Sequence, residues 1–574
     1  MLRRRLIFLA PVFAVISLAA AASEPDPRLM LLDSMATELH RNQAELKLQG
    51  HEPPYFIGYQ VKQGEQYEIA ARYGALFQND FNRDRKLYVE VRVGSYEFDN
   101  SIGEDLDFNF SLKGNSYITY KNGPIDDDPM ALRTALWLIT DERYKNALFN
   151  YLKKKGENVY SVDNPKKPPS FSREKPVEFV QSPVDFSFDR QRWTRLARDL
   201  SGRFKSARAV FDSEVRISAA KIVRYHVSTE GSRLVTEQTL YGVHIQGVTR
   251  AEDGQLLEDS RDFYSAIEGR LPSDLRLSES TEKLISELLA LREAPAIDPY
   301  TGPAILEPAA AGVLFHETIG HRLEGERQDD DAAEGKTFRG QVGRRVLPGF
   351  ISIYDDPTVS AVRGEGLNGF YRYDEEGVPA QRATLVEDGI LRSYILSRHP
   401  VEGFLHSNGH GRSQGNRKPM ARMANLIIDS KKQVSDAELK TMLIAEAKRQ
   451  GKPYGLIIRD ITGGSTNTST FGYQAFKGVP RMVYRVDVRD GKETLVRGVE
   501  IVGTPLSSIN KIMATGKAHG VFNGFCGAES GHVPVSTVAP PTLLQEIELQ
   551  RAMEGKDRPP LLESPTSALK KAER

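Results

Sequence analysis

Residues 308–326 read PAAAGVLFHETIGHRLEGE and predict a helix packed inside the fold, because the residues before the first histidine are small and apolar. His316 and His321 follow, with Glu317 directly after the first histidine. In the familiar zinc-binding pattern H-E-x-x-H, the histidines are four residues apart and share one helix face. Here the separation is five residues, so the pattern needs a different backbone to bind one ion.

The extra residue determines whether the two imidazoles can meet. In a regular helix, five residues turn the second histidine about 140° away from the first. A single π-type turn over Thr318–Gly320 would return both to one face, and such bulges are frequent at functional sites. Gly320 favours that turn because it has no Cβ to crowd it. Taken alone, the pattern also fits two neighbouring histidines that share no ion.

A third ligand is needed for a zinc site, and the chain has a single cysteine, Cys526, in the stretch NGFCGAESGHVPV. Gly524 and Gly527 flank it and predict a turn that could carry the thiolate to the helix. Two histidines and one cysteine form a known catalytic zinc set. The alternative for Cys526 is a buried, inert thiol. A single cysteine also excludes an internal disulfide.

Bulk properties favour a multidomain globular protein. The chain has 574 residues, and its Lys plus Arg and Asp plus Glu counts are both 77. This balance gives no electrostatic support for nucleic-acid binding. Three arginines, an apolar run and Ala20-Ala21-Ala22 at the N-terminus are typical of a secretory signal peptide, residues 1–22. We expect export, to a bacterial periplasm; the alternative is an N-terminal anchor that is retained.

Periodicity and turn residues predict an α+β fold: an N-terminal α/β domain with mixed or antiparallel strands, then a C-terminal β-rich domain that carries the histidine helix. We place these domains at 23–215 and 216–551, with a Pro-rich, linker-like stretch at 163–186 and a disordered tail at 552–574. Expected helices are 26–50, 129–155, 193–204, 281–293 and 435–450. Expected strands are 55–61, 67–76, 86–93 and two or three within 218–254.

Six stretches then resemble the TldD/PmbA metallopeptidases, specifically the catalytic TldD-like branch. They span about residues 300 to 545 in order: HETIGHRLEGE (316–326), FRGQVGRRV (338–346), DEEGVPAQRATLVEDGIL (374–391), NGHGRSQGNRKPMARMANLII (408–428), YGLIIRDITGGSTNTSTFGYQAF (454–476) and GVFNGFCGAESGHVPVSTVAPPTL (520–543). The N-terminal part is similar only in its broad order of helix and strands.

The resemblance implies a zinc-dependent peptidase with His316, His321 and Cys526 as ligands and Glu317 as catalytic base. It also implies dimers, either homodimers or pairs with a PmbA-like subunit lacking the metal motif, that act on unfolded peptides in a closed interior. The sequence departs from the family in its signal peptide, since the best-known members are cytoplasmic. It also has His410 where the family pattern has asparagine.

Two further regions are candidates for lining the substrate path. His410 and Arg412 could provide polar groups there, or they could stabilise their own loop. Gly463 and Gly464, in TGGSTNTST (462–470), could expose backbone that pairs with an extended peptide, or they could form a hairpin turn.

Three other functions remain as alternatives. A non-catalytic PmbA-like partner would not need all four motif residues. A DNA-associated modulator is opposed by the neutral charge. An amidase acting on cell-wall peptides would use the same residues as a peptidase.

Overall fold

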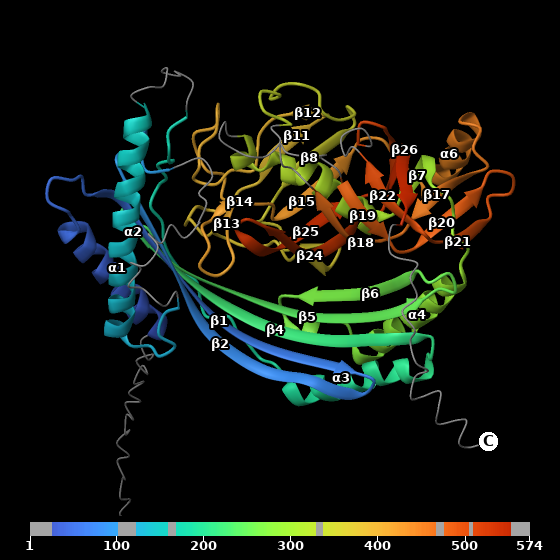
Figure 1. Cartoon of the computed structure of the whole chain (residues 1–574), viewed down its shortest axis with the longest axis horizontal. Coiled ribbons are helices and arrows are strands. Elements are labelled where there is room, and N and C mark those ends of the chain that lie inside the picture. The colour runs from blue at the N-terminus through green and yellow to red at the C-terminus, as the bar shows by residue number, and fades with distance from the viewer. Residues whose placement is uncertain are drawn as a thin grey trace, which may run out of the picture.

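The computed structural model describes residues 26–101, 122–158, 168–328, 337–466, 476–503 and 509–552. A long curved sheet from the first half of the chain lies along one side of a β-rich body formed by the second half (Figure 1). This arrangement is the α+β fold that the sequence predicts. The predicted signal peptide and nearly all of the predicted tail fall outside the described residues.

The first sheet is six-stranded and mainly antiparallel, in the order β2-β1-β4-β5-β3, with β6 also paired to β5. Only the short strand β3 runs parallel to its neighbour. Its strands are β1 (Pro54–Arg72), β2 (Ala75–Val93), β3 (Glu178–Val180), β4 (Val210–Ser228), β5 (Arg233–Arg250) and β6 (Leu256–Ser265).

The three short strands expected over 55–93 are in fact two long ones, β1 and β2, joined at Tyr73 and Gly74, which both have positive φ. The polar segment 62–66 interrupts the apolar pattern of the sequence, yet it pairs with β2 on one side and β4 on the other. Backbone pairing on both sides keeps it extended, although its side chains do not alternate in polarity.

Four helices cover this sheet: α1 (Pro27–Glu45), α2 (Pro129–Asn158), α3 (Arg190–Gly202) and α4 (Asp274–Glu293). The Asp26 side chain caps α1 as predicted, accepting from the backbone N–H of Arg28, but the helix ends at Glu45 rather than near Gly50. α1 and α2 pack on one end of the sheet around one apolar cluster, and α3 and α4 pack on the other end around a second.

The domain boundary expected at 215–216 falls inside β4, and the first sheet continues to Ser265 in β6. A break at 215 would cut a strand that is paired along both edges. The described part of the linker-like stretch, residues 168–186, is attached to this sheet, because β3 pairs with β5 and Phe171 and Ser172 are buried.

Two sheets form the β-rich body. The ten-stranded sheet has the order β18-β19-β22-β26-β7-β17-β20-β21, with β23 paired to β26 and β16 paired to β23. Its strands are β7 (Tyr300–Leu306), β16 (Gln433–Val434), β17 (Tyr454–Ile458), β18 (Ile461–Thr466), β19 (Phe476–Pro480), β20 (Val483–Asp487), β21 (Glu493–Val496), β22 (Val499–Gly503), β23 (Ile512–Gly516) and β26 (Thr542–Arg551).

The six-stranded sheet has the order β12-β11-β8-β15-β25-β24. Its strands are β8 (Ile351–Asp355), β11 (Ala383–Glu387), β12 (Ile390–Leu391), β15 (Asn425–Ser430), β24 (Gly520–Ala528) and β25 (Gly531–Ala539). There are also two two-stranded sheets. In one, β9 (Ala361–Val362) pairs with β10 (Glu365–Gly366); in the other, β13 (Gly411–Arg412) pairs with β14 (Met420–Ala421).

Helix α5 (Pro308–Phe315) contacts strands of both sheets: β24 and β25 of the six-stranded sheet and β18 of the ten-stranded sheet. Helix α6 (Asp436–Arg449) packs on β7 and β17, and Ser435 caps it as predicted. Residues 310–315 of α5 are all buried, as their apolar character predicts. Across the described residues, no helix has the length and apolar character that a membrane crossing requires.

Candidate metal centre

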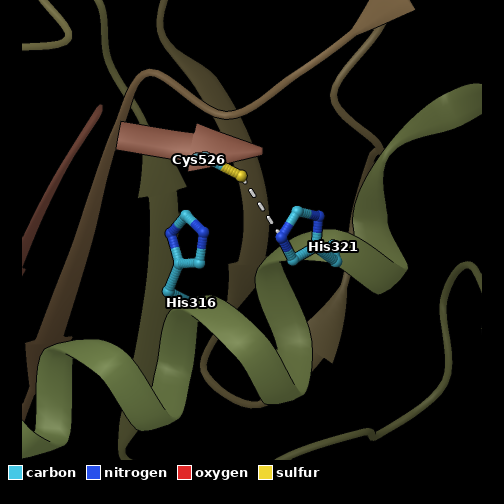
Figure 2. Close-up of side chains that lie close together, drawn as sticks. All are labelled: His316, His321 and Cys526. Atoms are coloured by element: carbon cyan, nitrogen blue, oxygen red, sulfur yellow. Dashed lines mark hydrogen bonds between the residues drawn. The ribbon is translucent and has the colours of Figure 1, made fainter. Parts of the chain in front are cut away.

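The helix widens at the histidine motif. α5 is followed by a π-helical turn, His316–Gly320, and by a 3₁₀ turn, His321–Leu323. The backbone N–H of His321 donates to the carbonyl of His316, an i→i+5 bond. The predicted π-type turn is therefore confirmed. Both imidazoles project from the same side of the helix (Figure 2), with ring centroids 5.0 Å apart.

Side chains stabilise this unusual turn. Arg322 Nη1 donates to the carbonyls of Glu317 and Thr318, each at 3.0 Å, and so satisfies oxygens near the end of the helix. Gly320 has ordinary helical angles, so left-handed freedom is not its role. A Cβ at Gly320 would lie 2.1 Å from Met423 Sδ. The residue is thus needed for close packing of the turn against Met423.

Cys526 belongs to the six-stranded sheet and approaches the two histidines from there. It lies within β24, opposite Val533 of β25. The expectation of a turn at Gly524 and Gly527 is wrong, because both glycines are strand residues paired with β25. The sulfur points from the strand to the helix (Figure 2), and Cys526 Sγ is 3.3 Å from His321 Nε2. Ligand atoms of all three residues lie within 4.8 Å of one another.

Burial shapes the electrostatics of the cluster. His316, His321 and Cys526 are each at most 8% exposed. Burial raises the pKa of the Cys526 thiol, but the charges of His321 and His316 outweigh it and hold that pKa well below the usual value. Burial lowers the pKa of His321, while Cys526 and Glu324 raise it to about 10. The cluster therefore favours a thiolate balanced by positive charge.

The three residues fit a zinc ion. One imidazole nitrogen from each histidine and the sulfur of Cys526 converge in a buried place. Two imidazoles and one thiolate are ligands that zinc prefers, and three protein ligands leave a position for water or substrate.

Glu324 orients one of the histidines, a role that we did not predict from the sequence. Its carboxylate accepts from His321 Nδ1 at 3.2 Å and from Arg327 Nε at 2.7 Å. This contact leaves Nε2 of His321 directed at Cys526, as in the carboxylate–histidine–metal arrangement of known zinc sites. The only signal for it in the sequence is its position three residues after a ligand histidine.

Glu317, the predicted base, lies within the π turn beside His316 and is 8% exposed. Arg322 is nearby: burial lowers its pKa to about 10, and the negative charge of Glu317 opposes that shift. The carboxylate therefore belongs to the same buried region as the three ligand residues. In such a low-dielectric region, electrostatic interactions are stronger than in water.

The side chains of His410 and Arg412 are bonded within the protein. His410 is fully buried, with Nε2 3.3 Å from Asp355 Oδ1 and Nδ1 2.9 Å from Asn408 Oδ1. Arg412 donates to the carbonyls of Met423 at 2.6 Å and Pro534 at 2.8 Å. These contacts agree with the loop-stabilising alternative, and neither residue joins the ligand cluster.

Gly463 and Gly464 lie in β18, which pairs with β19 through Gly464 and Gly478. β18 is the last strand on its side of the ten-stranded sheet and lies beside α5 and the π turn. Both glycines are therefore strand residues, and the segment that joins the two strands lies outside the described residues. The pairing also places the glycine strand at a sheet edge next to the ligand helix.

The fold and the buried histidine–cysteine cluster define an α+β protein with a candidate metal-binding site. Residues 299–551 match the family model of the PmbA/TldA metallopeptidase C-terminal domain. This part of the chain therefore carries a domain of the TldD/PmbA metallopeptidase family.

Individual relatives agree with this assignment. A metalloprotease of Archaeoglobus fulgidus is 28% identical over 370 residues, 63% of this chain and 78% of the relative. The zinc metalloprotease TldD homolog of Saccharolobus solfataricus is 27% identical, over 48% of this chain and 56% of its own length. The crystal structure of TldE from Thermococcus kodakarensis has the same fold, with a TM-score of 0.59 and 14% identity over 90% of this chain and 100% of that chain.

Proposed function

We propose that the chain is a zinc-dependent peptidase of the TldD type that hydrolyses peptide bonds in unfolded or small peptides. The strongest support is the cluster of His316, His321 and Cys526. The π turn supplies the two histidines and also carries Glu317, and strand β24 supplies the cysteine. A non-catalytic partner would gain nothing from a π turn that aligns two imidazoles with the only thiol of the chain. The name of the Saccharolobus relative also supports zinc.

Bound zinc would supply Lewis acidity, activating a water and polarising the scissile carbonyl. His316 and His321, as neutral imidazoles, and Cys526, as thiolate, would hold the ion. The Glu317 carboxylate would take the proton from the attacking water and deliver it to the leaving nitrogen. The edge strand β18 would bind an extended peptide through its backbone, placing the substrate beside the π turn.

Zinc analysis of the purified mature protein, combined with cleavage of an unfolded casein-like substrate with and without chelator, tests this function. We expect about one zinc per chain and loss of cleavage on chelation. Glu317→Gln should abolish cleavage but retain zinc. Glu438→Gln, an exposed glutamate on α6, is the matched control and should keep wild-type activity. Cleavage that survives in Glu317→Gln rules the mechanism out.

The substrate class needs a separate comparison. Crosslinked cell-wall peptides should be assayed beside the casein-like substrate, since an amidase would use the same four residues. Preference for the unfolded polypeptide supports the peptidase, and preference for the cell-wall peptide supports the amidase.

We further propose export to the periplasm and assembly as a homodimer or with a PmbA-like subunit. The N-terminal arginines and apolar run support export, and membership of the TldD/PmbA family supports assembly. Cell fractionation tests the first. Light scattering, together with identification of any copurifying subunit, tests the second.

A further inference from the structure

Arg422 is a buried residue that reaches the ligand thiol, and its role is not part of the proposed mechanism. It is 1% exposed and follows β14, where its backbone N–H donates to the carbonyl of His410 at 3.1 Å. Its Nη2 donates both to the carbonyl oxygen of Cys526 at 2.7 Å and to Cys526 Sγ at 3.1 Å. A charged donor thus lies directly against the sulfur.

The guanidinium is held in place by further contacts. Nη1 donates to Ser530 Oγ at 2.9 Å and to the carbonyl of Gly531 at 3.0 Å, in the turn between β24 and β25. Nε lies 3.5 Å from Glu324 Oε1, an ion pair too long for a good hydrogen bond. Since the other oxygen of Glu324 accepts from His321, Arg422 is linked to two of the three ligand residues.

We propose that Arg422 is a positioning residue that tunes the metal centre by donating a charged hydrogen bond to the Cys526 thiolate. This inference rests on the proposed function, because it requires an ion at the cluster. A thiolate gives the metal more negative charge than an imidazole does, and so weakens it as a Lewis acid. A guanidinium donor withdraws charge from the sulfur and offsets part of that effect, as hydrogen bonds around metal ligands do elsewhere.

Arg422 could instead serve only to fasten the β24–β25 turn, since it also bonds backbone carbonyls there. Arg412 provides the matched comparison. It is also buried, at 4% exposed, and its guanidinium donates to the carbonyls of Met423 and Pro534 rather than to Cys526. Loss of either arginine removes packing and carbonyl contacts, but only loss of Arg422 removes the bond to sulfur.

The test is the absorption spectrum of the protein loaded with Co²⁺. Thiolate-to-cobalt charge transfer gives a band whose energy falls when the sulfur becomes a stronger donor. Arg422→Met should shift this band to longer wavelength, Arg422→Lys should shift it less, and Arg412→Met should leave it in place. With zinc bound, Arg422→Met should lower kcat/KM about 10- to 100-fold.

The outcomes separate the two proposals. If both Arg422 variants bind Co²⁺ with the wild-type band, or if Arg412→Met shifts it equally, the role of Arg422 is overturned while the peptidase proposal stands. If the wild-type chain binds neither Co²⁺ nor Zn²⁺, both proposals fail. Should Arg422→Met not fold, Arg422→Lys, which keeps the charge, provides the spectrum that decides the question.

Discussion

At the candidate metal centre, Cys526 comes from strand β24, whereas both histidines come from the π turn. Its Sγ lies 3.3 Å from His321 Nε2, so a serine oxygen there would be at a similar place but would be a much poorer zinc ligand. The free energy of zinc binding at protein sites is about 10–16 kcal/mol, shared among about four ligands. We therefore expect Cys526→Ser to weaken zinc binding by at least about 100-fold, measured by competition with a chromophoric chelator.

His406→Ala is a suitable control for that measurement, because His406 has a side chain that is 71% exposed and stands apart from the cluster. Its zinc affinity should equal that of the wild type. Unchanged affinity in Cys526→Ser would remove the thiolate from the ligand set.

His226, in β4, makes the stability of the protein depend on pH. It is 9% exposed, and neither ring nitrogen has a hydrogen-bond partner in the described part of the chain. Burial, with a smaller contribution from the charge of Arg398, lowers its pKa to about 3. The unfolded chain, with an ordinary pKa near 6.5, binds this proton first as the pH falls. Stability is thus full above about pH 6.5 and falls between about pH 6.5 and 3.

The expected slope from His226 is up to about 1.4 kcal/mol per pH unit in that window. His226→Gln should therefore lose less stability than the wild type between pH 6.5 and 4.5, measured by urea unfolding at each pH. His406→Gln, with its exposed side chain, is the control and should follow the wild type. Parallel curves for His226→Gln and the wild type would contradict the assignment.

The clustering of His316, His321 and Cys526 could be predicted from the sequence, because a single cysteine and a histidine pair leave few combinations. Glu324 and Arg422 could not. Glu324 is near His321 in sequence, but its role depends on Arg327 and on the tautomer of the histidine. Arg422 is 104 residues from Cys526, and only the tertiary fold brings them together.

Among the elements, the π turn is the feature on which the site depends. Gly320→Ala would place a Cβ 2.1 Å from the sulfur of Met423, which is itself buried. Overpacking of this kind costs about 1–3 kcal/mol. We expect Gly320→Ala to lower the midpoint of thermal unfolding and to weaken zinc binding, since the turn must shift to make room.

Gly156→Ala is the matched control for that change. Gly156 is also helical, in α2, but a Cβ there would meet nothing within 4 Å. Alanine should stabilise that helix by about 0.5–1 kcal/mol. If Met423→Ala combined with Gly320→Ala does not recover zinc binding, the clash is not what weakens the site.

Element prediction succeeded where local chemistry determines the structure. The caps at Asp26 and Ser435, and the π turn, follow from side chains that act within a few residues. It failed where distant pairing determines the structure. Residues 62–66 are extended because two neighbouring strands pair with them, and Cys526 is in a strand because β25 pairs with it despite two flanking glycines.

At the scale of the whole molecule, the long sheet and the β-rich body are joined by buried charged contacts. Arg398 of the body donates to both carboxylate oxygens of Glu230, at the β4–β5 turn, each at 2.8 Å. It also donates to the carbonyl of Ser172 and packs 4.0 Å from the centroid of the Phe171 ring. With the Arg398 side chain 2% exposed, this is a desolvated pair rather than a surface one.

Arg398→Met should therefore destabilise the contact between the two parts by about 3–5 kcal/mol, because the Glu230 carboxylate, only 12% exposed, would lose its charged partner. Calorimetry should show an earlier transition that separates from the rest. Adding Glu230→Gln should recover part of the loss, since the unpaired charge is then absent. Arg489→Met is the control: its side chain is 86% exposed in a surface pair with Asp487, so its loss should leave the melting profile close to that of the wild type. If Arg398→Met melts in one transition at the wild-type midpoint, the two parts are held together by apolar packing instead.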